Sequence, residues 1–329
     1  MIEIKVDKKT ELLGVMLLIS KYKDKYPFLV EECGNKEYRN KIFASFKKFN
    51  NEKTIVLLNE IIDNLCFNYD APVFLINQLN EDYSFKYLPD YPFKSRLQSS
   101  PVVIEFLNSI KLFAKKIEFD KFYESNMSFY KIGINQINNL IKNYNFVEFF
   151  KDFYKFDFSN VKFIINLMFF ATNGNYGTNF KNDFVCNQCL RTCENNTINF
   201  IDSIDNTLTL YVHEFSHSVI NPLTEKYSKL TLKNFENIKD KMIKLQYNNA
   251  DVIIDEHIIR GIELVFLKYY YKTNDGINYV EKWKKEYEFL GFEYIGKVFE
   301  KLDYYFMNKD KFKNFEEYFP QILKVFEKI

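Results

Sequence analysis

Two histidines four residues apart, in the segment His-Glu-Phe-Ser-His at 213–217, constrain the fold more than any other feature of this sequence. The chain has 3 His in 329 residues. Random placement would produce a His-Glu-x-x-His pattern in only about four of a thousand such chains. Residues four apart on an α-helix project from one face, so both imidazoles can reach one metal ion. The pattern therefore predicts a helix and a second element that approaches the same face.

The helix that carries both histidines is predicted to span residues 207–221. Asn221-Pro222 is expected to end it, because proline cannot continue the hydrogen-bond ladder. Asn221 lies one turn beyond His217, where it can hold the second ring nitrogen of a ligand imidazole or act only as a C-cap. Three polar residues can cap the start of the helix: Asp205, Asn206 and Thr207.

Glu214 is the candidate catalytic residue. It lies about 100° around the helix from His213, so its carboxylate can reach a water on the metal without displacing that water. This is the position of a general base. The alternative interpretation is a helix with two surface histidines that lie together by chance.

A catalytic zinc ion keeps three protein ligands and one open position, so His213 and His217 require a third ligand. The strongly apolar helix predicted at 250–271 carries Glu256, Arg260 and Glu263 on one face. We prefer Glu256 to Glu263 as the ligand, because this choice leaves Arg260 to pair with Glu263. The alternative is that the three charges form an ordinary solvent-exposed face.

Hydrolysis also requires a donor to the reacting carbonyl oxygen. Arg260, His257 or one of the many Tyr residues could supply it, and the sequence does not choose among them. His257 is adjacent to Glu256 and points elsewhere on the helix, so it is either such a donor or a surface histidine.

The predicted fold class is α+β, mostly helical with a small sheet next to the His-Glu-x-x-His helix. Apolar residues recur every three or four positions through a helical N-terminal region, 1–155. Region 156–329 begins with a predicted sheet at 160–204, whose edge we place near Asn-Tyr-Gly-Thr-Asn-Phe at 175–180. The boundary between the regions is soft, and both can form one compact unit.

Composition excludes two classes of partner. The net charge of +1 leaves no cationic surplus to attract nucleic acid, and no apolar run is long enough to span a membrane. No signal peptide is visible, so we expect a cytoplasmic protein, or a secreted one if a signal has been removed. Three of the 5 Cys lie close together, either as metal or redox residues or as small buried side chains: Cys186, Cys189 and Cys193.

Four stretches resemble a bacterial family of predicted gluzincin-like metallopeptidases that is classified as a domain of unknown function. They are VDKKTELLGVMLLISKY, NYGTNF, HEFSHSVINPL and DEHIIRGIELVFL, of which HEFSHSVINPL is the specific one. The resemblance spans most of the chain and implies a zincin-like fold. It also implies that His213, His217 and Glu256 are the zinc ligands and that Glu214 is the base, but it implies no substrate.

These features predict a metallopeptidase that uses one catalytic Zn²⁺ to activate water and hydrolyse a peptide or protein substrate. A peptide would bind as an added strand along the edge of the sheet. Two alternatives stay open: a zinc hydrolase of a non-peptide amide or ester, and a binding or scaffold module that keeps the metal without turnover. The sequence does not indicate the oligomeric state.

Overall fold

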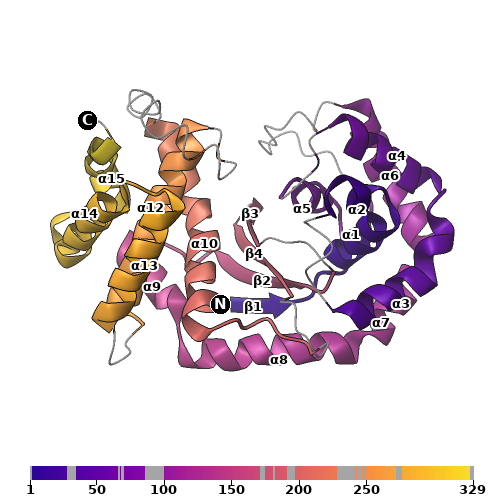
Figure 1. Cartoon of the computed structure of the whole chain (residues 1–329), viewed down its shortest axis with the longest axis horizontal. Helices are drawn as coiled ribbons and strands as arrows, with labels where there is room; N and C mark the ends of the chain where they lie inside the picture. The colour runs from indigo at the N-terminus through magenta and orange to yellow at the C-terminus, as the bar shows by residue number, and fades with distance from the viewer. Residues whose placement is uncertain are drawn as a thin grey trace.

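A computed structural model of the chain confirms the α+β class, with many helices around a small mixed sheet. In Figure 1 the sheet lies at the centre, between the N-terminal helices and the helices that follow strand β4. None of the described helices combines the length and apolar character needed to span a membrane. The structure describes residues 2–27, 35–65, 67, 70–85, 100–170, 175–180, 182–190, 197–227, 242, 247, 249–271 and 276–326.

The N-terminal region is largely helical, as predicted. Its first helix begins where the Asp7 carboxylate accepts hydrogen bonds from the backbone N–H groups of Lys9 (2.8 Å) and Thr10 (3.3 Å). The helices of this region are α1 (Lys8–Ile19), α2 (Tyr22–Lys25), α3 (Lys36–Phe46), η2 (Lys47–Phe49), α4 (Lys53–Asn64), α5 (Ala71–Ile76), α6 (Pro101–Lys116), α7 (Phe119–Ser125), α8 (Met127–Asn143) and α9 (Phe146–Tyr154).

The sheet has the strand order β1-β2-β4-β3, with β3 antiparallel to β4 and the other pairs parallel. The predicted sheet region contains β2 (Lys162–Met168), β3 (Tyr176–Phe180) and β4 (Asp183–Cys189), and β3 is an edge strand at the expected place. We did not predict β1 (Ile2–Lys5), which pairs with β2. Four residues with partial burial carry little signal of their own, so only pairing with β2 makes them a strand.

The cysteine cluster falls partly on strand β4. Cys186 is 0% exposed and Cys189 is 5% exposed. Cys193 lies outside the described residues, so the structure does not place the three thiols relative to one another. Burial of the first two agrees with the interpretation of small apolar side chains.

Helix α10 (Ile204–Tyr227) carries the His-Glu-x-x-His pattern and starts earlier than predicted. The hydroxyl oxygen of Ser203 accepts a hydrogen bond from the backbone N–H of Asn206 at 3.2 Å. Ser203 therefore caps the helix, and none of the three predicted residues does.

The predicted end of α10 at Asn221-Pro222 is wrong, because the helix continues through Pro222 to Tyr227. Proline removes one backbone hydrogen bond, and tertiary contacts of the following turn offset this loss. Leu223 and Thr224 are buried, and the Tyr227 ring lies 5.9 Å from the ring of Phe319.

The second predicted helix, at 250–271, corresponds to α12 (Ala250–Tyr269). Asn249 caps it by accepting a hydrogen bond from the backbone N–H of Asp251 at 2.8 Å. Helices α10 and α12 lie side by side in Figure 1 and in the contacts of the structure. The remaining elements are α13 (Gly276–Leu290), α14 (Ile295–Met307), η4 (Lys309–Lys311), α15 (Phe315–Leu323) and η5 (Lys324–Phe326).

A buried carboxylate connects α1 to the neighbouring elements. Glu11 is 1% exposed and accepts hydrogen bonds from the backbone N–H of Phe169 (2.9 Å) and the hydroxyl of Tyr38 (2.6 Å). The Tyr38 hydroxyl also shares a hydrogen bond with Tyr130 at 2.6 Å. Burial raises the pKa of Glu11 to about 7, although its two hydrogen bonds act in the opposite direction.

Replacing Glu11 with Gln should remove a pH dependence from the stability of the protein. Because the folded-state pKa is raised from 4.5 to about 7, the folded protein binds this proton more tightly than the unfolded chain. Its contribution to stability is therefore complete below pH 4.5 and is lost as the pH rises to about 7. This shift in the pKa of Glu11 corresponds to a change of about 3 kcal/mol in the free energy of unfolding.

Urea unfolding of both proteins between about pH 4 and pH 8 measures this effect. The free energy of unfolding should decline less with rising pH in Glu11→Gln than in the wild type. The Gln amide oxygen can still accept from Phe169, so the contact itself is preserved. Parallel pH profiles for the two proteins would contradict the prediction.

Candidate metal centre

Helix α10 is held against the sheet and α9 by contacts on the side opposite α12. The Tyr211 hydroxyl donates to Gln188 in β4 at 2.7 Å, and the Tyr154 hydroxyl bonds to Ser216 at 2.8 Å. The Phe215 ring lies 5.2 Å from the ring of Phe163 in β2. These buried contacts fix the rotation of α10, so the face with the two histidines points toward α12.

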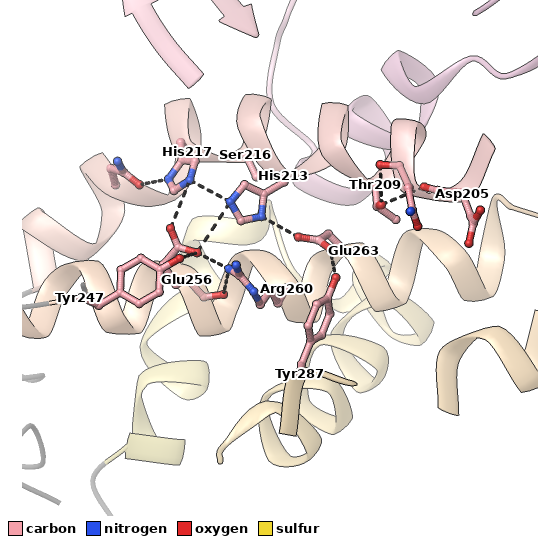
Figure 2. Close-up of polar contacts among 12 residues, drawn as sticks. Asp205, Thr209, His213, Ser216, His217, Tyr247, Glu256, Arg260, Glu263 and Tyr287 are labelled. Carbon is pink, nitrogen blue, oxygen red and sulfur yellow. Dashed lines mark hydrogen bonds and ion pairs between the residues drawn. The ribbon is translucent and has the colours of Figure 1, made fainter. Parts of the chain in front are cut away.

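His213, His217 and Glu256 form the group that can hold a metal ion, with ligand atoms within 4.8 Å of one another. The two Nε2 atoms are 3.2 Å apart, and the Glu256 oxygens lie 3.7 Å from Nε2 of His213 and 3.6 Å from Nε2 of His217. Ligand atoms around a tetrahedral zinc ion lie about 3.3 Å apart. The three side chains, shown in Figure 2, therefore fit such an ion with small adjustments.

Both histidines are oriented through their second ring nitrogen. Nδ1 of His213 lies 2.6 Å from Oε1 of Glu263, and Nδ1 of His217 lies 3.0 Å from the side-chain amide of Asn221. The carboxylate at Nδ1 of His213 places a proton there and leaves Nε2 of that ring toward the centre of the group. Glu263 thus orients an imidazole and lies outside the ligand group, and Asn221 occupies the place proposed from the sequence.

The Glu263 carboxylate is itself held by a tyrosine. The Tyr287 hydroxyl of α13 donates to Oε2 of Glu263, whose other oxygen faces His213. Glu263 is 4% exposed, so both of its oxygens have partners inside the protein. This chain from α13 to α10 restricts the orientation of the His213 ring.

Arg260 pairs with Glu256, so the expected Arg260–Glu263 pair is wrong. The guanidinium carbon of Arg260 lies 4.2 Å from the centre of the Phe292 ring, and the Tyr247 hydroxyl lies 3.2 Å from Oε2 of Glu256. On a helix, Arg260 can reach Glu256, four residues earlier, as readily as Glu263, three residues later. The contact with the Phe292 ring favours the position of the guanidinium beside Glu256. The solvent-exposed interpretation is also wrong, since Glu256 is 6% exposed.

Buried charges shift the pKa values within the group. Burial lowers the pKa of His217 to about 4, with a further contribution from neighbouring His213. Burial also disfavours the charged form of His213, but the carboxylates of Glu256 and Glu263 outweigh it and raise its pKa. Burial opposes ionisation of Glu256, yet Arg260 and both histidines hold its pKa at about 2. One face thus combines an ionised carboxylate with two imidazoles.

Glu214 lies on the side of α10 that faces the edge of the sheet and is 7% exposed. The backbone of Gly177 in β3 lies against it and favours the ionised carboxylate, which also interacts electrostatically with His213 and Glu256. Burial raises the pKa of Glu214 to about 7. The candidate base therefore lies between the ligand group and the edge strand.

His257 does not join the group. It is 0% exposed, its Nδ1 lies 2.7 Å from the carbonyl oxygen of Ile253, and its ring packs against Phe292 and Phe326. It is therefore not the surface histidine that the sequence allowed, and its ring is enclosed by aromatic side chains.

Three residues near the group were not found from the sequence: Gly177, Tyr247 and Tyr287. Nothing in the sequence distinguishes the two tyrosines among 24 in the chain, because their partners come from other elements. Gly177 lay in the segment predicted as an edge strand, but its contact with Glu214 depends on how the sheet meets α10.

The fold and the site define a mostly helical α+β protein with a His-His-Glu group that could hold a metal ion. The chain belongs to the family described as the domain of unknown function DUF4932, whose model matches residues 2–325. Comparisons with curated proteins and with solved structures found no match.

Proposed function

We propose that this protein is a zinc-dependent metallopeptidase with a zincin-like catalytic region. The observation that carries the proposal is the position of Glu214 between two features, the His-His-Glu group and the edge strand β3. The first feature is suited to binding Zn²⁺ and the second to binding an extended peptide. A scaffold module would require neither a carboxylate at this position nor an open strand beside it.

In the proposed reaction, His213, His217 and Glu256 hold the ion, and Glu263 and Asn221 keep the two imidazoles oriented. Zinc, when bound, lowers the pKa of water and polarises a carbonyl group. Glu214 accepts the proton of the attacking water and transfers it to the leaving amine.

Tyr247 and Arg260 are the candidate donors to the developing oxyanion, because both contact the Glu256 carboxylate from the α12 side. The tyrosine hydroxyl can turn toward a substrate more easily than the guanidinium, which packs on Phe292. Among the donors considered from the sequence, the proposal therefore favours a tyrosine.

The substrate class follows from strand β3. As an edge strand it pairs with β4 on one side, and a substrate in extended conformation could add along the other side. Affinity would then come from main-chain hydrogen bonds with several residues. We expect cleavage of unstructured peptides in preference to dipeptides or single-residue amides.

A peptide library that contains both size classes, incubated with zinc-loaded protein, tests this function. We expect cleavage within the longer peptides, loss of cleavage after chelation and recovery after zinc is returned. Turnover confined to esters or non-peptide amides would favour the alternative hydrolase. Metal binding without turnover of any substrate would favour the scaffold module.

A further inference from the structure

Gly177 in edge strand β3 directly contacts Glu214. A Cβ atom placed on Gly177 would lie 2.4 Å from the backbone carbonyl oxygen of Glu214 and 3.0 Å from Oε2 of its carboxylate. The backbone N–H of Gly177 also favours the ionised form of this carboxylate. The glycine therefore contacts both the main chain and the side chain of the candidate base.

The position requires a glycine because a side chain has no room there, and not because the backbone adopts an unusual conformation. Among the described residues, the glycine with a positive φ is Gly291, at 110°. Gly177 lies in a regular strand, where its register partner is Cys186 in β4, and any residue can adopt that conformation. What another residue cannot do is place a Cβ atom 2.4 Å from a carbonyl oxygen.

Neither side of this contact can move easily. On either side of Gly177, the carbonyl oxygen of Tyr176 and the hydroxyl of Thr178 accept hydrogen bonds from the side-chain amide of Asn187 at 3.0 and 3.1 Å. Asn187 is 0% exposed, so this part of β3 is held from the interior. Helix α10 is held by its own buried contacts with the sheet, described above. A side chain at 177 would therefore displace Glu214 or the strand.

We propose that Gly177 is a positioning residue for Glu214. Its N–H holds the carboxylate in place beside the ligand group, and its lack of a side chain lets the edge strand lie directly against the turn of α10 that carries the base. The same contact sets the distance between the base and a peptide bound along β3. This inference rests on the proposed role of Glu214 as the general base.

The kinetic test compares Gly177→Ala in two backgrounds, the wild type and Glu214→Gln. Misplacement of a catalytic group by about 1 Å can cost about 100-fold in rate. We expect Gly177→Ala to keep zinc and to lose about this factor in kcat in the wild type, with little further loss in Glu214→Gln. Equal losses in both backgrounds, or no loss in the wild type, would overturn the proposal.

Gly133→Ala in α8 is the matched control. Its added Cβ would lie 2.6 Å from the Phe200 ring, so it introduces a similar steric conflict without touching Glu214. We expect this variant to lose stability and to keep kcat. A comparable loss of kcat in Gly133→Ala would show that general destabilisation explains the effect, against the proposal.

A measurement independent of turnover separates this inference from the proposed function. The chain has 9 Gly, so labelling with ¹⁵N-glycine gives a simple amide spectrum. Glu214→Ala should accelerate hydrogen exchange of the Gly177 amide by about tenfold or more, since it removes a charged acceptor. The Gly133 amide should be unchanged. Unaltered exchange at Gly177 would overturn the inference, even if Gly177→Ala fails to fold or no substrate is found.

Discussion

Glu214→Gln should bind zinc as the wild type does and hydrolyse peptides about 10²- to 10⁴-fold more slowly. The amide retains the size of the carboxylate, and its oxygen can still accept a hydrogen bond from the proposed donor, the Gly177 N–H. It cannot take a proton from water, so the loss should appear in kcat. The measurement combines metal content with steady-state kinetics on the best substrate of the peptide library.

The size match between Glu and Gln makes this variant informative about proton transfer. Its metal content should equal that of the wild type, because Glu214 is outside the His-His-Glu group. Undiminished hydrolysis by Glu214→Gln would exclude Glu214 as the base. Loss of zinc together with activity would show instead that Glu214 contributes to the metal site.

The two carboxylates of α12 should differ in their effect on zinc affinity. Glu256→Gln removes an ionised candidate ligand and should cause the larger loss. Glu263→Gln removes only the acceptor at Nδ1 of His213, and such partners of a ligand are typically worth about 10- to 100-fold in metal affinity. Zinc affinities of the two variants and the wild type, measured by competition with a chelator, test this order.

These two substitutions are matched, since both carboxylates are on α12 and almost fully buried, with exposures of 6% and 4%. A general destabilisation of the helix would therefore affect both variants alike. A larger loss in Glu263→Gln than in Glu256→Gln would reverse the roles of the two carboxylates. Wild-type affinity in Glu256→Gln would exclude Glu256 from the metal shell.

Much of the secondary structure could be predicted from the sequence, because helices with a buried face repeat apolar residues every three or four positions. The helices of the N-terminal region were predicted in this way, whereas the strands within 160–204 were predicted from an apolar run of strand length. Strand β1 could not be, since four residues near the N-terminus form a strand only through pairing with β2. The end of α10 was misjudged because the turn after Pro222 is packed in the tertiary structure, where Leu223 and Thr224 are buried and Tyr227 contacts Phe319.

In the candidate site, sequence spacing determined that His213 and His217 share a helix face and that Glu256 and Glu263 share another. This information is local, because it follows from the number of residues per helical turn. The spacing could not determine which carboxylate meets the Nε2 atoms and which meets Nδ1 of His213. That depends on how far α12 is shifted along α10, which the packing of both helices decides.

The contact between Gly177 and Glu214 also depends partly on local sequence pattern and partly on tertiary packing. The sequence by itself placed a strand at 175–180 and a glutamate on the following helix, since both are matters of local pattern. Only the tertiary structure brought the Gly177 backbone into contact with Glu214. The reason is that strand order, pairing with β4 and the rotation of α10 together set that distance, and each depends on residues far apart in the chain.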